Sequence, residues 1–234
     1  MSRSLRAVRL ALHPSRSFVH GFPKGHTVQR FGTLSARLIF AGIWFCVAFG
    51  CASPPSNTKN SCAIFEEKGG WYKSALKSQE KWGVPIHVQL AIINQESRFE
   101  HDAKPPRDRI LWVIPWFRSS SAFGYGQAQD GTWDAYRNST GKRGADRDDF
   151  DDVVDFVGWY GDVSNRKLGI AKDDAYRQYL AYHEGWTGYM RKTYKKKKWL
   201  IKVARDVERT AHKYRNQLAR CEDDLDKGWS LWPF

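Results

Sequence analysis

Apolar residues recur at helical spacing between Cys62 and Cys221, and this segment has no convincing run in which apolar and polar residues alternate. Because a helix returns every third or fourth residue to one face, whereas a strand alternates, the spacing predicts a mainly α fold. The segment has no internal repeat, so a repeat array is not expected. Within a chain of 234 residues, one domain around one core is the simplest organisation.

We expect five helices in this segment. Their predicted ranges are 66–82, 85–97, 150–159, 173–183 and 198–218. Gly83 is a typical residue just beyond a helix, and Pro85 suits the first position of the next one. Residues 103–121 contain three prolines and are expected to form a loop with at most a short turn.

A 13-residue apolar run, Leu38 to Gly50, precedes this domain and follows Arg37. The run is too short to span a membrane but is typical of the apolar part of a secretory signal. Residues 1–50 are therefore expected to be a signal peptide, and an over-called start codon would explain its length. For the Arg- and Ser-rich residues 1–36, a mitochondrial transit peptide is the competing interpretation.

Cys51 ends this apolar run and resembles the lipidated cysteine of a bacterial lipobox, although Ala48 and Phe49 depart from the usual pattern. The resemblance implies a lipid anchor at Cys51. Ala52 stands where lipoproteins retained in the inner membrane have Asp, which implies the outer membrane. Plain secretion and an uncleaved anchor are the alternatives.

Residues 51–61 would then contain the lipidated Cys51 and form a flexible tether, and residues 62–234 would form the folded catalytic domain. Seven of the 38 Lys and Arg residues, and none of the 25 Asp and Glu residues, precede Cys51, so the remainder carries a net charge of +6. This excess suits an approach to acidic polymers of the cell envelope. It is too small and too mixed to indicate nucleic-acid binding.

Cys62 and Cys221 lie near opposite ends of the predicted domain. Since an exported protein enters an oxidising compartment, we expect a disulfide between them. Two buried free thiols are the alternative. Neither cysteine has a Cys or His partner at short range, so no zinc site is expected, and no other metal or cofactor is indicated.

Three short strings carry the candidate chemistry, and they are Gln95-Glu96-Ser97-Arg98-Phe99, Gly124-Tyr125-Gly126-Gln127 and Ala181-Tyr182-His183-Glu184-Gly185. In this order they resemble the signature of the SLT-domain lytic transglycosylases, within the superfamily of soluble lytic transglycosylases and goose-type lysozymes. The resemblance covers about residues 71–188. It implies a lysozyme-like single catalytic domain that cleaves the glycan strands of peptidoglycan.

Glu96 is the candidate catalytic residue. Cleavage of a glycosidic bond requires a proton on the leaving oxygen, and a carboxylic acid with a raised pKa supplies one near neutral pH. Glu96 should emerge beside Ile92 and Ile93, where desolvation favours its neutral form. The resemblance implies that Glu96 acts first as acid and then as base, so that the sugar's 6-hydroxyl closes a 1,6-anhydro ring. A solvated helix-terminal Glu is the alternative interpretation.

The first two strings contain three further site candidates. The resemblance implies that Ser97 hydrogen-bonds the substrate or Glu96, and that Gln127 lines the cleft beside the acid. Tyr125 and Gly126 replace the family's usual Leu-Met pair, and Tyr125 is a candidate for contacts with the sugar. A simple turn is the alternative interpretation of the Gly-x-Gly-Gln string.

Tyr182 and His183 are the candidates in the third string. Tyr182 would donate its hydroxyl to Glu96 and orient the carboxyl. His183 replaces the Asn of the family and can still donate a hydrogen bond from its imidazole. A packed helix-end histidine is the alternative.

Aromatic and basic side chains flank these strings. The candidates for stacking on sugar rings are Trp112, Trp116, Trp186 and Tyr189, with core packing as the alternative. The long loop between Phe99 and Ser121 is expected to form a lid or the wall of a subsite. The basic run from Arg191 to Lys198 is interpreted either as a solvated approach to a helix or as a site for phosphate or acidic glycan.

Two other activities compete with the transglycosylase interpretation. A hydrolytic goose-type lysozyme that inverts needs a second carboxylate ~6.5–9.5 Å from the acid to activate water. Asp130, Asp134 and Glu184 are near the strings and are candidates for that role. A non-catalytic glycan-binding lipoprotein is the other alternative.

Overall fold

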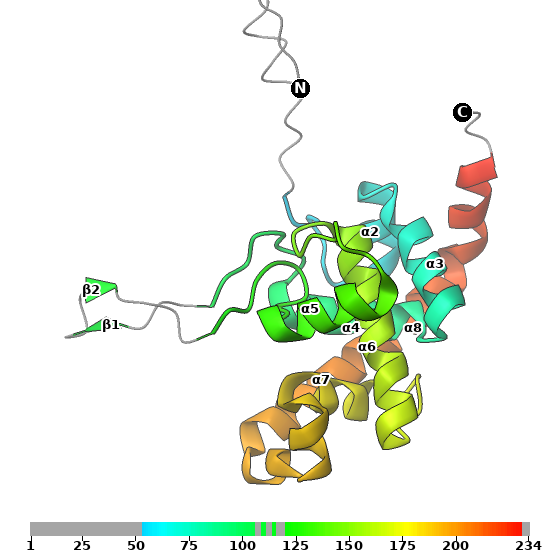
Figure 1. Cartoon of the computed structure of the whole chain (residues 1–234). Helices are drawn as coiled ribbons and strands as arrows, with labels where there is room; N and C mark the ends of the chain where they lie inside the picture. Colours follow the sequence, from blue (N-terminus) through cyan, green and yellow to red (C-terminus); the bar gives the residue numbers. More distant parts are fainter. Residues whose placement is uncertain (1–52, 106–108, 111–113, 116–119, 231–234) are drawn as a thin grey trace, which may run out of the picture. The chain divides into compact units, whose positions relative to one another are not determined.

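The computed structural model describes residues 53–105, 109–110, 114–115 and 120–230, with side chains described for 53–105 and 120–227. The chain divides into two units, Met1–Gly50 and Cys51–Phe234, and every described residue belongs to the second. The helices in chain order are α2 (Ser61–Glu67), α3 (Trp71–Trp82), α4 (Ile86–Ser97), α5 (Asp130–Thr140), α6 (Phe150–Leu168), α7 (Ala175–Met190), the 3-10 helix η1 (Thr193–Lys196) and α8 (Lys198–Ser230). The described part is thus mainly helical, which confirms the predicted fold class (Figure 1).

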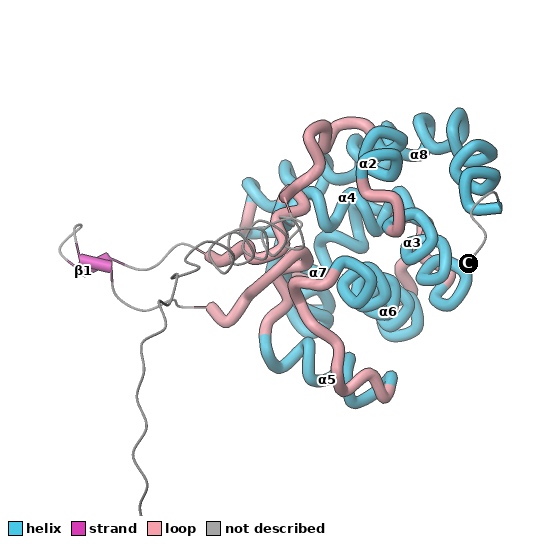
Figure 2. Tube along the Cα trace, turned by 90° about the horizontal axis from the view of Figure 1, so that it is seen from above, coloured by secondary structure: helices cyan, strands magenta, loops and turns pink. Residues whose placement is uncertain are grey.

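Helix α4 lies among the other helices and is buried on almost every side (Figure 2). Its buried residues include Val88, Leu90 and Ile93, and it packs against α3, α6, α7 and α8. A helix that is apolar all round is stable only when neighbours cover every face. Its carboxyl end reaches a cavity, and Glu96 stands at that end.

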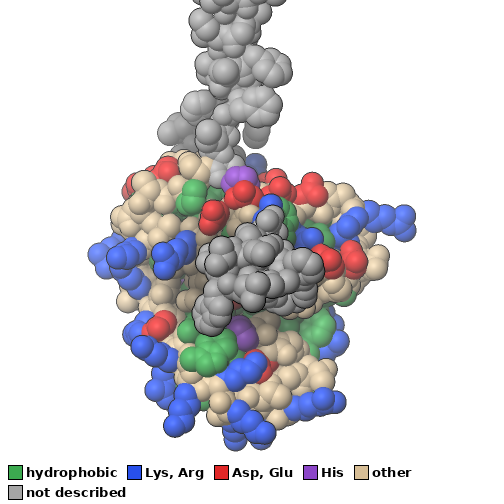
Figure 3. Space-filling model, turned by 90° about the vertical axis from the view of Figure 1, so that its left-hand side faces the viewer, with side chains coloured by type: hydrophobic (Ala, Val, Ile, Leu, Met, Phe, Trp, Pro, Cys, Tyr) green, Lys and Arg blue, Asp and Glu red, His purple; other side chains and the backbone are tan. Residues whose placement is uncertain are grey.

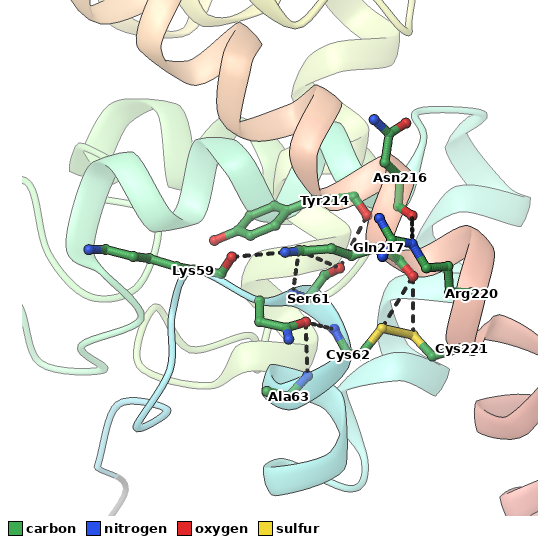
Figure 4. The surroundings of a disulfide bond; sticks show 10 residues. Lys59, Ser61, Cys62, Ala63, Tyr214, Asn216, Gln217, Arg220 and Cys221 are labelled. Atoms are coloured by element: carbon green, nitrogen blue, oxygen red, sulfur yellow. Dashed lines mark hydrogen bonds between the residues drawn. A yellow bond between two sulfur atoms is a disulfide. The ribbon is translucent and has the colours of Figure 1, made fainter.

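Helix α8 runs past α7 and α4 to α2, so it joins the beginning of the domain to its end (Figure 1). The expected disulfide between Cys62 and Cys221 is present, with the two Cα atoms 6.1 Å apart. Beside it, the Ser61 hydroxyl donates to the Tyr214 carbonyl and the Ser61 backbone N–H donates to Gln217 Oε1 (Figure 4). Covalent and polar contacts therefore hold α2 against α8.

A buried carboxylate joins three further helices. The Asp155 side chain on α6 accepts hydrogen bonds from Trp82 Nε1 on α3 at 2.8 Å and from the Tyr136 hydroxyl on α5 at 2.7 Å. Lys81 and Lys142 complete the group with ion pairs at 3.2 Å each. Burial raises the pKa of Asp155, but these donors and cations outweigh it and hold that pKa below its ordinary value.

Several predicted boundaries are wrong. The first predicted helix is two elements, α2 and α3, separated where Gly69 and Gly70 interrupt the chain. Helix α5 was not expected, and α6, α7 and α8 each extend beyond their predicted ends. The predicted loop contains a short antiparallel pair, β1 (Arg109–Ile110) and β2 (Ile114–Pro115). Of the described helices, none combines the length and apolarity that a membrane span requires.

Candidate active site

A cavity of about 390 Å³ lies where α4, α6, α7 and the loop before α5 meet. Its wall contains residues from all three of the sequence strings. These lining residues include Glu96, Gln127, Tyr182, His183 and Glu184. The structure therefore brings together strings that are up to 90 residues apart in the chain.

Glu96 enters the cavity from the end of α4. Its Oε1 atom is buried and has no hydrogen-bond partner among the described residues. Burial raises the pKa of Glu96 from 4.5 to about 7, and an interaction with the Tyr179 side chain partly opposes that shift. Glu96 is thus a carboxyl that holds its proton near neutral pH and can release it, as a general acid must.

The backbone directly after Glu96 is unusual. Arg98 and Phe99 are consecutive non-glycine residues with positive φ, at 55° and 64°. Gln127, across the cavity, also has a positive φ, of 47°. Such conformations cost about 1–3 kcal/mol each, and they concentrate at functional sites. Phe99 is fully buried, so packing of its ring holds the turn that ends α4 behind the acid.

Tyr182 does not make the hydrogen bond expected of it. Its hydroxyl donates to the Gly126 carbonyl at 2.5 Å, which ties α7 to the second string. Gly126 permits this approach, because a Cβ there would lie 3.0 Å from the Tyr182 hydroxyl. The tyrosine that interacts with the Glu96 carboxyl is Tyr179, one turn earlier on α7. Residues three apart share a helix face, so α7 presents both rings to the acid.

The second string is a tight loop that positions Gln127. Gly124 has φ of 75°, and a Cβ there would meet the Arg147 carbonyl oxygen at 1.9 Å, so only glycine fits. Gln127 lines the cavity as predicted, and its Nε2 donates to the carbonyls of Ala103 at 2.8 Å and Gly124 at 2.9 Å. With its amide hydrogens engaged, Gln127 presents Oε1 as the acceptor for a ligand.

Two predicted site residues lie outside the cavity wall. Tyr125 is a core residue that packs edge-on against Trp71 and Phe150, and burial raises its pKa to about 12. Ser97 is buried, and its hydroxyl donates to the Ile93 carbonyl at 3.4 Å. The Tyr125 ring thus packs in the core and the Ser97 hydroxyl bonds back to its own helix, and the predicted contacts of both residues with a sugar stay predictions.

The third string forms the opposite wall and is held by an ionic group. Glu184 accepts hydrogen bonds from Lys197 Nζ at 2.6 Å and from the Thr193 hydroxyl, and its Oε1 is 3.1 Å from His183 Nδ1. Burial raises the pKa of Glu184, but these partners outweigh it and lower that pKa overall. Glu184 is thus an ionised, fully engaged carboxylate, in contrast to Glu96.

Gly185 turns the chain at the end of this wall. Its φ of 70° and ψ of 160° interrupt the helical geometry of α7. An added Cβ would meet no atom within 4 Å, so the requirement for glycine comes from the backbone conformation and not from crowding. The break directs the chain into η1, which carries Thr193 back to Glu184.

Comparison with known families decides the assignment. The family model described as Transglycosylase SLT domain matches residues 39–221. The chain belongs to this family. No curated protein and no solved structure gave a match. Membership in the SLT family implies a lysozyme-like fold, peptidoglycan as substrate and lytic activity of the transglycosylase type, and SLT enzymes typically act in the periplasm or cell wall.

The three candidates for a second catalytic carboxylate in this SLT domain differ in their position relative to the cavity. Asp130 pairs with Arg147 at 2.8 Å and Asp134 lies 3.7 Å from Arg137, and both aspartate side chains are 63% exposed and outside the cavity wall. Glu184 does line the cavity, but its oxygens are engaged. Among the described residues, Glu96 is the cavity carboxyl with an unpartnered oxygen.

Two of the four aromatic candidates take part in ring stacks within this SLT domain. Trp186 stacks on Tyr160 with ring centroids 4.8 Å apart, and Tyr189 stacks on Tyr194 at 5.4 Å, so both stabilise the fold and do not line the cavity. Trp112 and Trp116 lie outside the described residues, as do Cys51 and residues 106–108, 111–113 and 116–119 of the predicted lid.

Sequence reasoning missed Tyr179, Tyr160 and Lys197 as parts of the site. Tyr179 had a usable signal, because it precedes Tyr182 by three positions on a predicted helix. Lys197 had no such signal, because its approach to Glu184 depends on the helix break at Gly185 and on the position of η1.

Proposed function

We propose that this protein is a lytic transglycosylase that cleaves the β-1,4 bond between N-acetylmuramic acid and N-acetylglucosamine and leaves a 1,6-anhydro-N-acetylmuramic acid end. The observation that carries the proposal is the buried, unpartnered carboxyl of Glu96 in the cavity, with its pKa raised to about 7. No cofactor takes part in the proposed reaction.

In the first step, neutral Glu96 donates its proton to the glycosidic oxygen as the bond to the muramic acid C1 breaks. Burial of the carboxyl keeps a proton on the acid at neutral pH. The Tyr179 side chain then stabilises the carboxylate that remains, because its interaction favours the charged form. Tyr182 acts indirectly, by fixing the Gly126 carbonyl and the loop that presents Gln127.

In the second step, the Glu96 carboxylate accepts the proton of the sugar's own 6-hydroxyl, whose oxygen bonds to C1. The carboxyl thereby returns to its neutral state, ready for another cycle. Since the nucleophile belongs to the substrate, the protein needs one acid–base group and no second free carboxylate. The pairing of Glu184 with Lys197 and Thr193 is consistent with this requirement.

Hydrolysis by a goose-type lysozyme mechanism is the second candidate, because Glu184 lines the same cavity. A catalytic base must be free to accept a proton from water. Glu184 meets this requirement only after losing its contacts with Lys197 and Thr193, which makes hydrolysis the less favoured reaction. A non-catalytic glycan-binding role does not require a carboxyl with a raised pKa, so it does not account for this property of Glu96.

We also propose that this protein is exported to the periplasm and is attached to the outer membrane through a lipid on Cys51. Under this proposal residues 1–50 are removed as a signal, residues 51–61 form the tether, and residues 62–234 form the catalytic domain. Labelling of cells with a radioactive fatty acid tests the anchor, since Cys51→Ser should abolish incorporation. Incorporation that persists in that variant would contradict the proposal.

Digestion of purified sacculi tests the reaction. We expect fragments that end in 1,6-anhydro-N-acetylmuramic acid, each lighter by one water than a hydrolysis product. Glu96→Gln should abolish lysis with the fold intact, because the amide cannot transfer a proton, whereas Asp130→Asn should leave activity unchanged. Reducing ends that incorporate heavy oxygen from labelled water would instead identify a lysozyme, and unchanged lysis by a folded Glu96→Gln variant would refute the role of Glu96.

A further inference from the structure

One basic segment of the chain carries several side chains that make no ion pair within the described residues. Six of the eight residues from Arg191 to Lys198, here called the basic turn, are Arg or Lys. Lys197 pairs with Glu184, whereas the other five are exposed and make no ion pair within the described part of the chain. These five are Arg191, Lys192, Lys195, Lys196 and Lys198. Five unpaired charges so close together create a positive potential that attracts anions.

Exposed apolar side chains border the basic turn on both sides. Trp199 is 55% exposed and Met190 is 59% exposed, and no other large hydrophobic side chain in the described residues is comparably exposed. They stand immediately after and immediately before the basic turn. Isolated exposed apolar residues are ordinary, but here an exposed aromatic ring, an exposed Met and five unpaired cations lie along one short stretch of the chain.

The basic turn is fixed to the cavity wall. The Trp199 ring packs edge-on against His183, with centroids 5.2 Å apart, and His183 lines the cavity. Lys197 and Thr193 bond to Glu184, which also lines the cavity. Figure 3 shows Lys and Arg side chains gathered on the lower part of this face, near a hydrophobic patch and a histidine. These contacts hold the backbone of the basic turn beside the cavity, which lowers the cost of ordering it when a ligand binds.

We propose that Trp199 and the basic turn extend the cavity into a second binding surface for the peptidoglycan strand. The Trp199 ring stacks on a sugar beyond the cavity, and the unpaired cations contact carboxylates of the stem peptides. This inference rests on peptidoglycan being the substrate. A glycan strand is favoured over an anionic membrane because the surface is continuous with the cavity through His183 and Glu184.

The test measures binding in a Glu96→Gln background, where the ligand stays intact. The ligands are isolated sacculi, a neutral chito-oligosaccharide and anionic phospholipid vesicles. Trp199→Ala should weaken binding of both glycans about tenfold, whereas Trp199→Phe, which keeps a flat ring, should restore most of it. Circular dichroism establishes that each variant is folded.

The charge variant is Lys195→Gln/Lys196→Gln/Lys198→Gln. It should weaken binding to sacculi roughly fivefold at about 0.1 M salt, with the difference lost near 1 M, where the Debye length is about 3 Å. Its binding to the neutral oligosaccharide should not change. The matched control, Lys59→Gln/Lys77→Gln/Lys213→Gln, removes the same charge from exposed positions outside the cavity wall and should bind sacculi normally.

Several results would overturn the inference. They are unchanged glycan binding by Trp199→Ala, an equal loss in the control variant, or Trp199-dependent binding to the vesicles in place of sacculi. The outcome is separate from that of the proposed reaction, because binding is measured without cleavage. Loss of glycan binding in Trp199→Ala supports the surface even if the wild-type protein proves to be a hydrolase.

Discussion

The burial of Glu96 makes the stability of the fold depend on pH in a way that one substitution removes. In the folded protein the pKa of Glu96 is about 7, against 4.5 for the free side chain. Folding therefore favours the protonated carboxyl, and its stabilising contribution is fully present below pH 4.5. The contribution is lost as the pH rises through 7, where the buried group must ionise. Glu96→Gln cannot ionise and is free of this loss.

The magnitude follows from the two pKa values. Each pH unit between them corresponds to about 1.4 kcal/mol, so the wild-type protein should lose about 3 kcal/mol relative to Glu96→Gln between pH 4.5 and pH 8. The amide adds an offset of its own, but that offset does not vary with pH. The difference in unfolding free energy between the two proteins is therefore compared at the two pH values, and its change isolates the ionisation of Glu96.

Urea unfolding of both proteins, followed by circular dichroism with the disulfide intact, measures this difference. Asp155 and Glu184 have lowered pKa values, so they lose stability as the pH falls, with the opposite sign. His87, whose pKa is lowered to about 4, also loses stability toward low pH. These three contributions are the same in both proteins, so they cancel in the difference between them. An unfolding free-energy difference that stays constant between pH 4.5 and pH 8 would refute the reasoning.

Three further predictions concern stability, each measured by urea unfolding. Asp155→Ala should cost about 3–5 kcal/mol, since it leaves the donors of Trp82 and Tyr136 unpaired, whereas the exposed Asp134→Ala should cost under about 0.5 kcal/mol; a small effect at Asp155 would contradict the described network. Cys62→Ser/Cys221→Ser should cost about 4–5 kcal/mol by the chain-entropy model, because the bridge spans 159 residues, and an unaltered midpoint would argue against that bridge. Gly185→Ala should cost about 1–3 kcal/mol through its backbone conformation; Gly131→Ala, equally uncrowded but within α5, should not, and equal effects would exclude a conformational cause.

The sequence predicted the fold class and the place of the acid because both depend on local patterns. Helix α4 is a nearly continuous apolar run, and Glu96 stands at the end of that helix. Helix α5 was missed because its sequence has little apolar content, and only Trp133 and Tyr136 are buried. Its burial comes from packing against α6, which no periodicity within α5 reveals.

The errors within the site have a common physical origin. A short string gives the order of residues but not the direction of each side chain. In the second string the positive φ of Gly124 turns the Tyr125 ring toward Trp71 and the core, while Gln127 faces the cavity. Tyr182 bonds to Gly126 because that residue lacks a side chain, a close approach that only the three-dimensional arrangement defines.

The two glutamates of the cavity illustrate how different surroundings within one site give the same type of side chain different roles. Glu96 is buried with an unpartnered oxygen, and its pKa is raised, whereas the cationic and hydroxyl partners of Glu184 lower the pKa of Glu184. Carboxyls with pKa values pushed apart divide acid–base work between them. Here the ionised partner is already bound to Lys197, so it fixes the cavity wall and the basic turn in place. That division agrees with the proposed lyase reaction, in which Glu96 protonates the glycosidic oxygen and the sugar's own hydroxyl is the nucleophile.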